Sequence, residues 1–275
     1  MTYLYAILLG LVQGITEFLP ISSSGHLALL QNLFRIEEAD LCFDIMLHLG
    51  TLFAVCAAYL RDVRDLIWGG FGLLGWGHDR RRKNPAAKKR RRMAILVLAA
   101  TVPTALGLLL KSSVETLSGN TIVVALMLII TGFVLKFSDS RSRGRREEES
   151  MSVLDGILIG LAQALAVLPG ISRAGLTISA GRLRGFSSEY AVKYSFLISI
   201  PVVIGAALLE VFDMITAGID TALLPYYLVG MLVSAVSGYF CIRMVRNLAA
   251  RSKFGWFAYY CWGAAIVALV LTLVA

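Results

Sequence analysis

Six apolar runs long enough to cross a lipid bilayer restrict the fold of this chain more than any other feature. They cover residues 41–60, 94–110, 120–136, 189–212, 223–242 and 255–275. A spanning helix needs about 20 mostly apolar residues, because it rises about 1.5 Å per residue through a hydrocarbon core about 30 Å thick. The chain is 57% apolar and only 16% charged, which excludes a soluble domain. We therefore predict an all-α polytopic membrane protein that forms a single integral membrane domain over residues 1–275.

Two further apolar stretches, 2–35 and 153–186, are interrupted by proline, serine and glycine. Each has a helix-like first piece and, after the break, a second piece of about a dozen residues, which as a helix would rise only about 18 Å and could not span. We expect two re-entrant helix-turn-helix hairpins, each entering and leaving the membrane on one side. Irregular backbone at membrane depth persists only where protein buries it or a polar cavity contains it, so each turn is a candidate site.

The positive charge is concentrated in short segments between the runs. Of 26 Lys and Arg residues, nine lie in 80–92 and five in 136–146. Basic loops face the cytoplasm, so both termini are predicted to be external. The same loops could contact anionic membrane lipid. No aromatic residues are interleaved with the charges, which argues against a nucleic-acid partner.

The chain is predicted to be an inverted-topology repeat with halves at about 1–137 and 152–275, joined by a basic cytoplasmic loop at 138–151. Each half would hold one hairpin and three transmembrane helices, and an odd number of spans reverses the second half. The hairpin sequences agree at an offset of 150 residues, in the pairs Gly10/Gly160, Gln13/Gln163, Ser22/Ser172 and Gly25/Gly175.

The two hairpins differ where chemistry could occur. The first carries Glu17, serines at 22–24 and His26, whereas the second carries Arg173. Ionisable groups at membrane depth are functional by default, and Glu17 would suit a general base or a metal ligand. Serine hydroxyls and N–H groups at a helix start bind phosphate, and arginine forks onto phosphate oxygens. The structural alternatives are a Glu17–Arg173 ion pair and simple helix caps.

Two polar residues also stand inside the first full span. Asp44 and His48 lie one helical turn apart. They could support the site from behind, but we expect them to form a satisfied buried pair.

Two motifs carry a resemblance to a known family. Gln13-Gly-Ile-Thr-Glu17 leads into Pro20-Ile-Ser-Ser-Ser-Gly-His26, and PGISRAGLT occupies 169–177. Over nearly the whole chain the sequence resembles the bacterial undecaprenyl-diphosphate phosphatases of the UppP or BacA type. The resemblance implies six spans with two re-entrant hairpins. It also implies removal of the terminal phosphate of undecaprenyl diphosphate at the external face of the inner membrane, which recycles the cell-wall lipid carrier and is associated with bacitracin resistance.

The resemblance also implies roles for individual residues. The catalytic residues would be Glu17, Ser23, His26 and Arg173, and the substrate-binding residues Gln13, Ser22, Ser24, Gly25, Ser172 and Thr177. A divalent cation, Mg²⁺ or Ca²⁺, is implied as cofactor. Because position 13 is glutamine, Glu17 is the one acid of the motif, so the cation would bridge Glu17 and diphosphate oxygens. Attack by Ser23 and attack by water both stay open, as does a homodimer.

Two other classes fit part of the pattern. PAP2-type lipid phosphatases share the SGH and SR letters, but Ser179 stands where their nucleophilic histidine is expected. A secondary transporter or flippase for a phosphorylated polyprenyl lipid would also be built from inverted repeats with broken hairpins. A pure transporter would release no phosphate.

Overall fold

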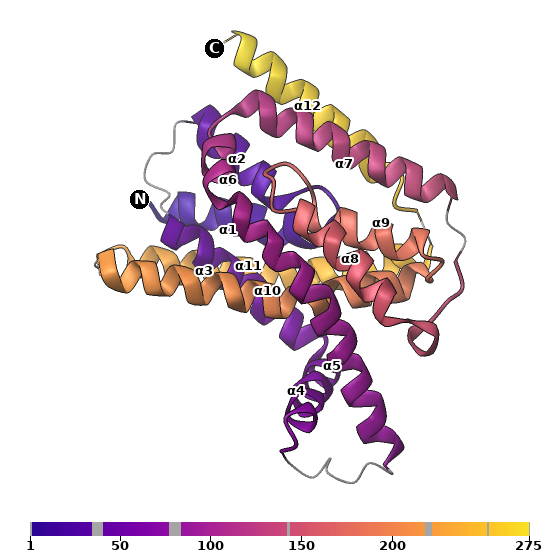
Figure 1. The fold of residues 1–275 in the computed structure, drawn as a ribbon. Coiled ribbons are helices and arrows are strands. Elements are labelled where there is room, and N and C mark those ends of the chain that lie inside the picture. Colours follow the sequence, from indigo (N-terminus) through magenta and orange to yellow (C-terminus); the bar gives the residue numbers. More distant parts are fainter. Residues whose placement is uncertain are drawn as a thin grey trace.

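The computed structural model describes residues 2–34, 41–76, 84–141, 144–217, 222–251 and 253–274. Within these ranges the chain is helical, and the one β pairing is a parallel bridge between Arg146 and Phe186. The helices, shown in Figure 1, are α1 (Tyr3–Phe18), α2 (Ser23–Phe34), α3 (Leu41–Ala58), α4 (Leu60–Leu73), α5 (Pro85–Thr104), α6 (Lys111–Ser118), α7 (Thr121–Arg141), α8 (Val153–Leu165), α9 (Arg173–Leu183), α10 (Ser188–Ala217), α11 (Leu224–Ala250) and α12 (Trp256–Val274), with 3₁₀ turns at Ala105–Leu110 and Glu148–Ser150.

The prediction of an all-α polytopic membrane protein is confirmed. By length and composition, α7, α10, α11 and α12 can each cross a membrane, and α3 with α4 forms a fifth candidate that bends by 95° at its break. The sixth predicted span, 94–110, falls on α5 and the 3₁₀ turn that follows it. The four candidate spans do not include α5, because the helix also contains five basic residues at 88–92.

The basic segment at 80–92 is a helix from Pro85 onward, so the prediction of a loop there is wrong for those residues. The Asn84 side chain accepts a hydrogen bond from the backbone N–H of Ala86 at 3.0 Å, and Pro85 occupies the first turn. Asparagine caps and first-turn prolines are both typical of helix starts. Lysine and arginine have high helix propensity, so the run of positive charge alone does not indicate where the loop ends and the helix begins.

Both predicted hairpins have the expected form of helix, turn and short helix. The second helices, α2 and α9, contain 12 and 11 residues and are too short to span. The turns use left-handed backbone at Ser22 (φ 69°) and Gly170 (φ 93°). A buried serine in this region is uncommon and marks a conformation that its surroundings impose.

Each hairpin packs against a helix from the other half of the sequence. Helix α1 lies along α11, and α8 lies along α5. A Cβ atom added at Gly10 would lie 2.7 Å from the carbonyl oxygen of Gly230, and one added at Gly160 would collide with the backbone of Ala100. The two equivalent glycines therefore make equivalent close contacts, as an inverted repeat predicts. The bounds of the two halves stay a prediction.

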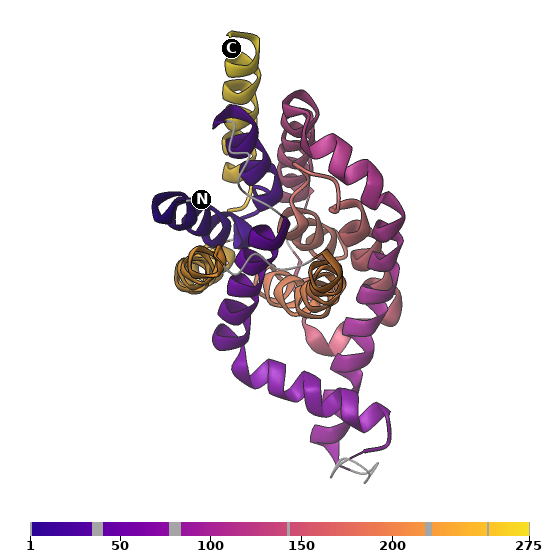
Figure 2. The same ribbon diagram turned by 90° about the vertical axis from the view of Figure 1, so that its left-hand side faces the viewer.

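A large apolar cluster secures the end of α1. The buried Phe18 ring meets Phe196 of α10 edge-on, with ring centroids 5.2 Å apart, and Phe196 also contacts Tyr59. This packing fixes the residue next to Glu17. Figures 1 and 2 show α4 and the first turns of α5 projecting from one end of the molecule, while both chain termini lie toward the other.

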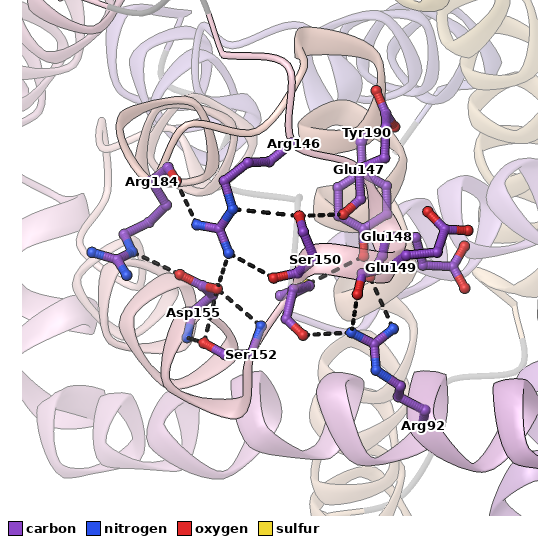
Figure 3. Close-up of polar contacts among 11 residues, drawn as sticks. Arg92, Arg146, Glu147, Glu148, Glu149, Ser150, Ser152, Asp155, Arg184 and Tyr190 are labelled. Carbon is purple, nitrogen blue, oxygen red and sulfur yellow. Dashed lines mark hydrogen bonds and ion pairs between the residues drawn. The ribbon is translucent and has the colours of Figure 1, made fainter.

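The segment 144–152, which we call the strap, closes the base of the second hairpin (Figure 3). It belongs to the predicted loop 138–151, of which residues 138–141 are in fact the end of α7. Arg146 donates to Asp155 Oδ2 at 2.8 Å, and Arg184 donates to Oδ1 at 2.7 Å. Arg92 of α5 donates to strap carbonyl groups, including that of Met151 at 2.6 Å. Residues 144–151 of the predicted loop thus form an ordered clamp between α5, α8 and the end of α9.

Asp155 is the fully buried centre of this clamp and stands in the first turn of α8. Burial alone would raise the pKa of Asp155. Hydrogen bonds from Arg146, the Ser152 backbone and Arg184 outweigh burial, and the pKa of its carboxyl is held well below the usual range.

Candidate active site

The turns of the two hairpins are in contact. A Cβ atom added at Gly25 would lie 2.8 Å from the Cα of Gly170, and one added at Gly175 would lie 3.5 Å from the carbonyl oxygen of Pro20. The hydroxyl of Ser22 donates across the contact to the carbonyl of Ile171 at 3.3 Å. This approach brings the N-terminal ends of α2 and α9 together, and such ends favour anions.

Two of the predicted binding serines hold these turns. The Ser22 hydroxyl accepts a hydrogen bond from the Gly25 N–H at 3.2 Å, and the Ser172 hydroxyl accepts one from the Gly175 N–H at 3.0 Å. Both serines are buried. Their hydroxyl groups therefore act as helix caps in the structure, in positions 150 residues apart, whereas Ser24 at the first turn of α2 is exposed.

Glu17 is the centre of the polar cluster between the turns. Its Oε2 atom accepts a close hydrogen bond from the Ser23 hydroxyl and a second from Gln13 Nε2 at 3.1 Å. Its Oε1 atom accepts a close, charge-assisted hydrogen bond from Arg173 Nη2. The side chains of Glu17 and Arg173 are only 7% and 15% exposed. An acid, a hydroxyl, an amide and a guanidinium from both hairpins thus form one buried group, which includes the Glu17–Arg173 ion pair named above as the structural alternative.

Half of the Arg173 fork is still available. The Nη1 atom is buried and has no hydrogen-bond partner among the residues that the structure describes. Buried guanidinium nitrogens normally carry partners, because an unmatched buried donor costs free energy. A phosphate oxygen would satisfy it.

His48 also belongs to this group. Its Nε2 atom lies 3.9 Å from Glu17 Oε2, and its Nδ1 atom lies 2.8 Å from the backbone carbonyl of Asp44. The Asp44 carboxylate accepts a hydrogen bond from Gln31 at 3.3 Å. The expectation of a satisfied buried Asp44–His48 pair therefore did not include Glu17, the residue that His48 Nε2 faces. Two polar residues one turn apart in an otherwise apolar span were the available signal.

A model of the family described as bacitracin resistance protein BacA matches residues 6–267 of the chain. The chain belongs to the BacA family. The resemblance predicted from the two motifs is confirmed.

Curated relatives agree over nearly the full length. An undecaprenyl-diphosphatase of Carboxydothermus hydrogenoformans is 40% identical over 272 residues, which cover 97% of this chain and 96% of the relative. An undecaprenyl-diphosphatase of Methanosphaera stadtmanae is 41% identical and covers 98% of both chains. The undecaprenyl-diphosphatase 3 of Bacillus cereus is 36% identical, also over 98% of both.

The imidazole of the first motif, His26, is directed elsewhere. Its Nδ1 atom lies 2.8 Å from the carbonyl of Ser22, and its Nε2 atom lies 2.9 Å from the hydroxyl of Tyr260, whose ring is stacked on it. In the described part of the chain His26 makes no hydrogen bond to Glu17 or Ser23. No motif in the sequence indicates Tyr260 of α12 as the neighbour of His26.

Thr177 is likewise outside the cluster. It is buried, donates to the carbonyl of Arg173 at 2.8 Å and shares a hydrogen bond of 2.6 Å with Ser195 of α10. Its contacts stabilise α9 behind Arg173.

The protein atoms alone do not form a cation cage. No group of three or more His, Cys, Asp or Glu suited to a metal occurs among the described residues. Glu17 is the one carboxylate of the cluster, and both of its oxygens already accept hydrogen bonds from Arg173, Ser23 and Gln13. Divalent cations such as Mg²⁺ need about six oxygen ligands, which this side-chain set does not supply.

Proposed function

We propose that this protein hydrolyses undecaprenyl diphosphate to undecaprenyl phosphate and inorganic phosphate, and so recycles the lipid carrier of cell-wall synthesis. One observation supports this most strongly: Glu17 contacts both Ser23 and Arg173, one from each hairpin. Phosphoryl transfer needs a nucleophile, a proton acceptor and cationic charge around the phosphate. Ser23, Glu17 and Arg173 supply these three groups, and the relatives of this chain described above are undecaprenyl-diphosphatases.

Arg173 would bind the substrate through Nη1, while its Nη2 atom stays on Glu17. The N–H groups at the starts of α2 and α9 would add further donors, because the first N–H groups of a helix have no partner within it. Neutralising the diphosphate in a nearly buried site lowers the barrier, since charge is stabilised more strongly there than in water.

Ser23 is the proposed nucleophile, and Glu17 the proposed base that accepts its proton. As the bond from Ser23 Oγ to the terminal phosphorus forms, the bond to the bridging oxygen breaks and undecaprenyl phosphate leaves. Water then cleaves the phosphoserine and releases inorganic phosphate. A water molecule in the place of the Ser23 hydroxyl would use the same base. His26, which the sequence analysis assigned to catalysis, would need to leave Tyr260 to take part.

A divalent cation would be held mainly by the diphosphate itself. The residues that the structure describes supply too few oxygen ligands for a cage. When bound, the cation would supply additional positive charge to the diphosphate. We expect it to arrive with the substrate.

The deciding experiment measures phosphate release from undecaprenyl diphosphate by the purified protein in detergent. Glu17→Gln, Ser23→Ala and Arg173→Ala should each lose most of the activity, whereas Ser199→Ala is a matched control. Ser199 is a buried serine of α10 that donates to the Phe196 carbonyl at 2.7 Å and makes no hydrogen bond to the Glu17 cluster within the described residues. Wild-type protein that binds the lipid but releases no phosphate would refute hydrolysis and favour transport.

The nucleophile requires a separate experiment. Acid quench of a reaction with substrate labelled in the terminal phosphate should trap phosphate on Ser23 if the serine attacks. Absence of the trapped phosphoserine under single-turnover conditions would indicate direct attack by water, which forms no covalent intermediate.

We also propose a location and orientation. The protein would reside in the bacterial inner membrane, with the basic segments in the cytoplasm and the site open to the outside. Labelling of single cysteines placed at Lys88 and at Thr2 with an impermeant reagent should mark only Thr2→Cys in intact cells. A homodimer stays a prediction that the mass of the solubilised protein would test.

A further inference from the structure

The tautomer of His48 follows from its contacts. A backbone carbonyl oxygen can only accept a hydrogen bond, so the Nδ1 atom that lies 2.8 Å from the Asp44 carbonyl carries the ring proton. In the neutral ring, the lone pair is therefore on Nε2. That atom lies 3.9 Å from Glu17 Oε2, the same oxygen that accepts the Ser23 proton.

The same reasoning separates His48 from His26. The Nδ1 atom of His26 donates to the Ser22 carbonyl, and its Nε2 lone pair accepts the hydroxyl proton of Tyr260. Both ring nitrogens of His26 are thus in use. The only lone pair of an imidazole that faces Glu17 in the described structure belongs to His48.

His48 also differs from Glu17 in its exposure at the protein surface. Its side chain is 34% exposed, whereas that of Glu17 is 7% exposed. A buried acid that has accepted a proton cannot readily return it to water. Other ionisable groups near the imidazole are Asp44 on its own helix and Arg173 beyond Glu17, and Arg173 cannot accept a proton.

We propose that His48 acts through Glu17, accepting the proton that Glu17 takes from the nucleophile and passing it out of the cluster. The inference rests on the proposed hydrolysis. The Ser23 proton moves to Glu17 as the Oγ–phosphorus bond forms and the bridging oxygen leaves with its electron pair. Glu17 then donates that proton to Nε2, which restores the carboxylate and leaves an imidazolium, and the imidazolium releases the proton to water. Water then completes the turnover: its oxygen attacks the phosphorus as the Ser23 Oγ–phosphorus bond breaks, one water proton returns to Ser23 Oγ through Glu17, and inorganic phosphate leaves.

The test compares His48→Ala and His48→Gln with the wild type in the phosphate-release assay. Glutamine preserves the size and polarity of the side chain but cannot accept a proton at this pH. Both variants should lose roughly 100-fold in kcat, within the range for removal of a positioned proton acceptor, while KM stays within about twofold. If His48 merely fills space, His48→Gln will keep the wild-type kcat, and the proposal is wrong.

Added imidazole supplies a readout that a structural role would not move. It should raise the kcat of His48→Ala at least several-fold and leave the wild type and Ser23→Ala unchanged. A folded His48→Ala protein that imidazole does not accelerate would contradict the relay. Inactive wild-type protein would instead refute the underlying hydrolysis, so the two failures are distinguishable.

A second measurement avoids substitution altogether and is decisive if the variants do not fold. Diethyl pyrocarbonate carbethoxylates accessible imidazoles, and mass spectrometry of wild-type protein identifies the modified histidine. Modification at His48 should inactivate the enzyme in proportion to occupancy, and undecaprenyl phosphate should protect it. Full turnover by protein modified at His48 would overturn the proposal.

Discussion

Replacing Arg173 with lysine tests whether the two terminal nitrogens of its guanidinium bind different partners, Glu17 and a phosphate oxygen. One nitrogen binds Glu17, and the other is buried without a partner among the described residues. Lysine keeps the charge but has a single nitrogen, so it cannot hold Glu17 and a phosphate oxygen with the same fork geometry. A hydrogen bond to a charged group contributes about 1.5–3 kcal/mol. Losing one should lower kcat/KM by roughly 10- to 150-fold.

Stability distinguishes this effect from simple damage to the fold. Arg173→Ala leaves the nearly buried Glu17 carboxylate without its cation, and breaking a buried pair in this way costs about 3–5 kcal/mol. Arg173→Lys keeps the pair, so its thermal midpoint in detergent should stay much closer to the wild type. The lysine variant should therefore separate lost activity from lost stability.

The assay is initial phosphate release over a range of undecaprenyl diphosphate concentrations, with the unfolding midpoint measured on the same preparations. Arg173→Lys within threefold of the wild-type kcat/KM would refute the argument, because one nitrogen would then serve both partners. A lysine variant as unstable as Arg173→Ala would also refute it.

Two further predictions concern the scaffold. Gly170→Ala should lower the unfolding midpoint, because left-handed backbone costs a non-glycine residue about 1–2 kcal/mol and the new Cβ would press on the Val124 carbonyl. The control Gly205→Ala should not lower the midpoint, because nothing lies within 4 Å of the added atom. Equal midpoints for the two variants would contradict this interpretation of the turn. Asp155→Asn should destabilise the protein at neutral pH. Because the folded pKa of Asp155 lies below its unfolded value of about 4, the stability from its ionised form is present above that pH and is lost as the pH falls. The wild-type midpoint should therefore approach that of Asp155→Asn on acidification below about pH 4, and a constant difference between them would oppose this account.

The sequence predicted the hairpins and the central contact because short-range chemistry determines them. Proline, glycine and serine end helices wherever they occur, and the offset of 150 residues paired the two turns before any contact was known. Glu17 and Arg173 could be paired because an unpaired charge at membrane depth is costly, so an acid and a guanidinium there tend to form an ion pair.

Other contacts depend on which helix packs against which, and a local sequence pattern does not predict that packing. The equivalent glutamines illustrate this: Gln13 donates to Glu17, whereas Gln163 donates to Thr104 of α5 at 2.8 Å. The hydrogen bond that turns His26 toward Tyr260 joins residues 234 positions apart. Long-range packing likewise determines the bend between α3 and α4 and the contact of the strap with Asp155.

The packing of α1 along α11 has a consequence for biosynthesis. About 200 residues separate the two helices, which at roughly 5–20 residues per second correspond to about 10–40 s of translation. For most of that interval the nascent first hairpin lacks both α11 and the guanidinium of Arg173, which follows Glu17 by 156 residues. The acid must therefore stay protonated, remain near the lipid headgroups or be sheltered by the insertion machinery. The packing of the first hairpin against α11 is thus one of the later contacts that the growing chain can make.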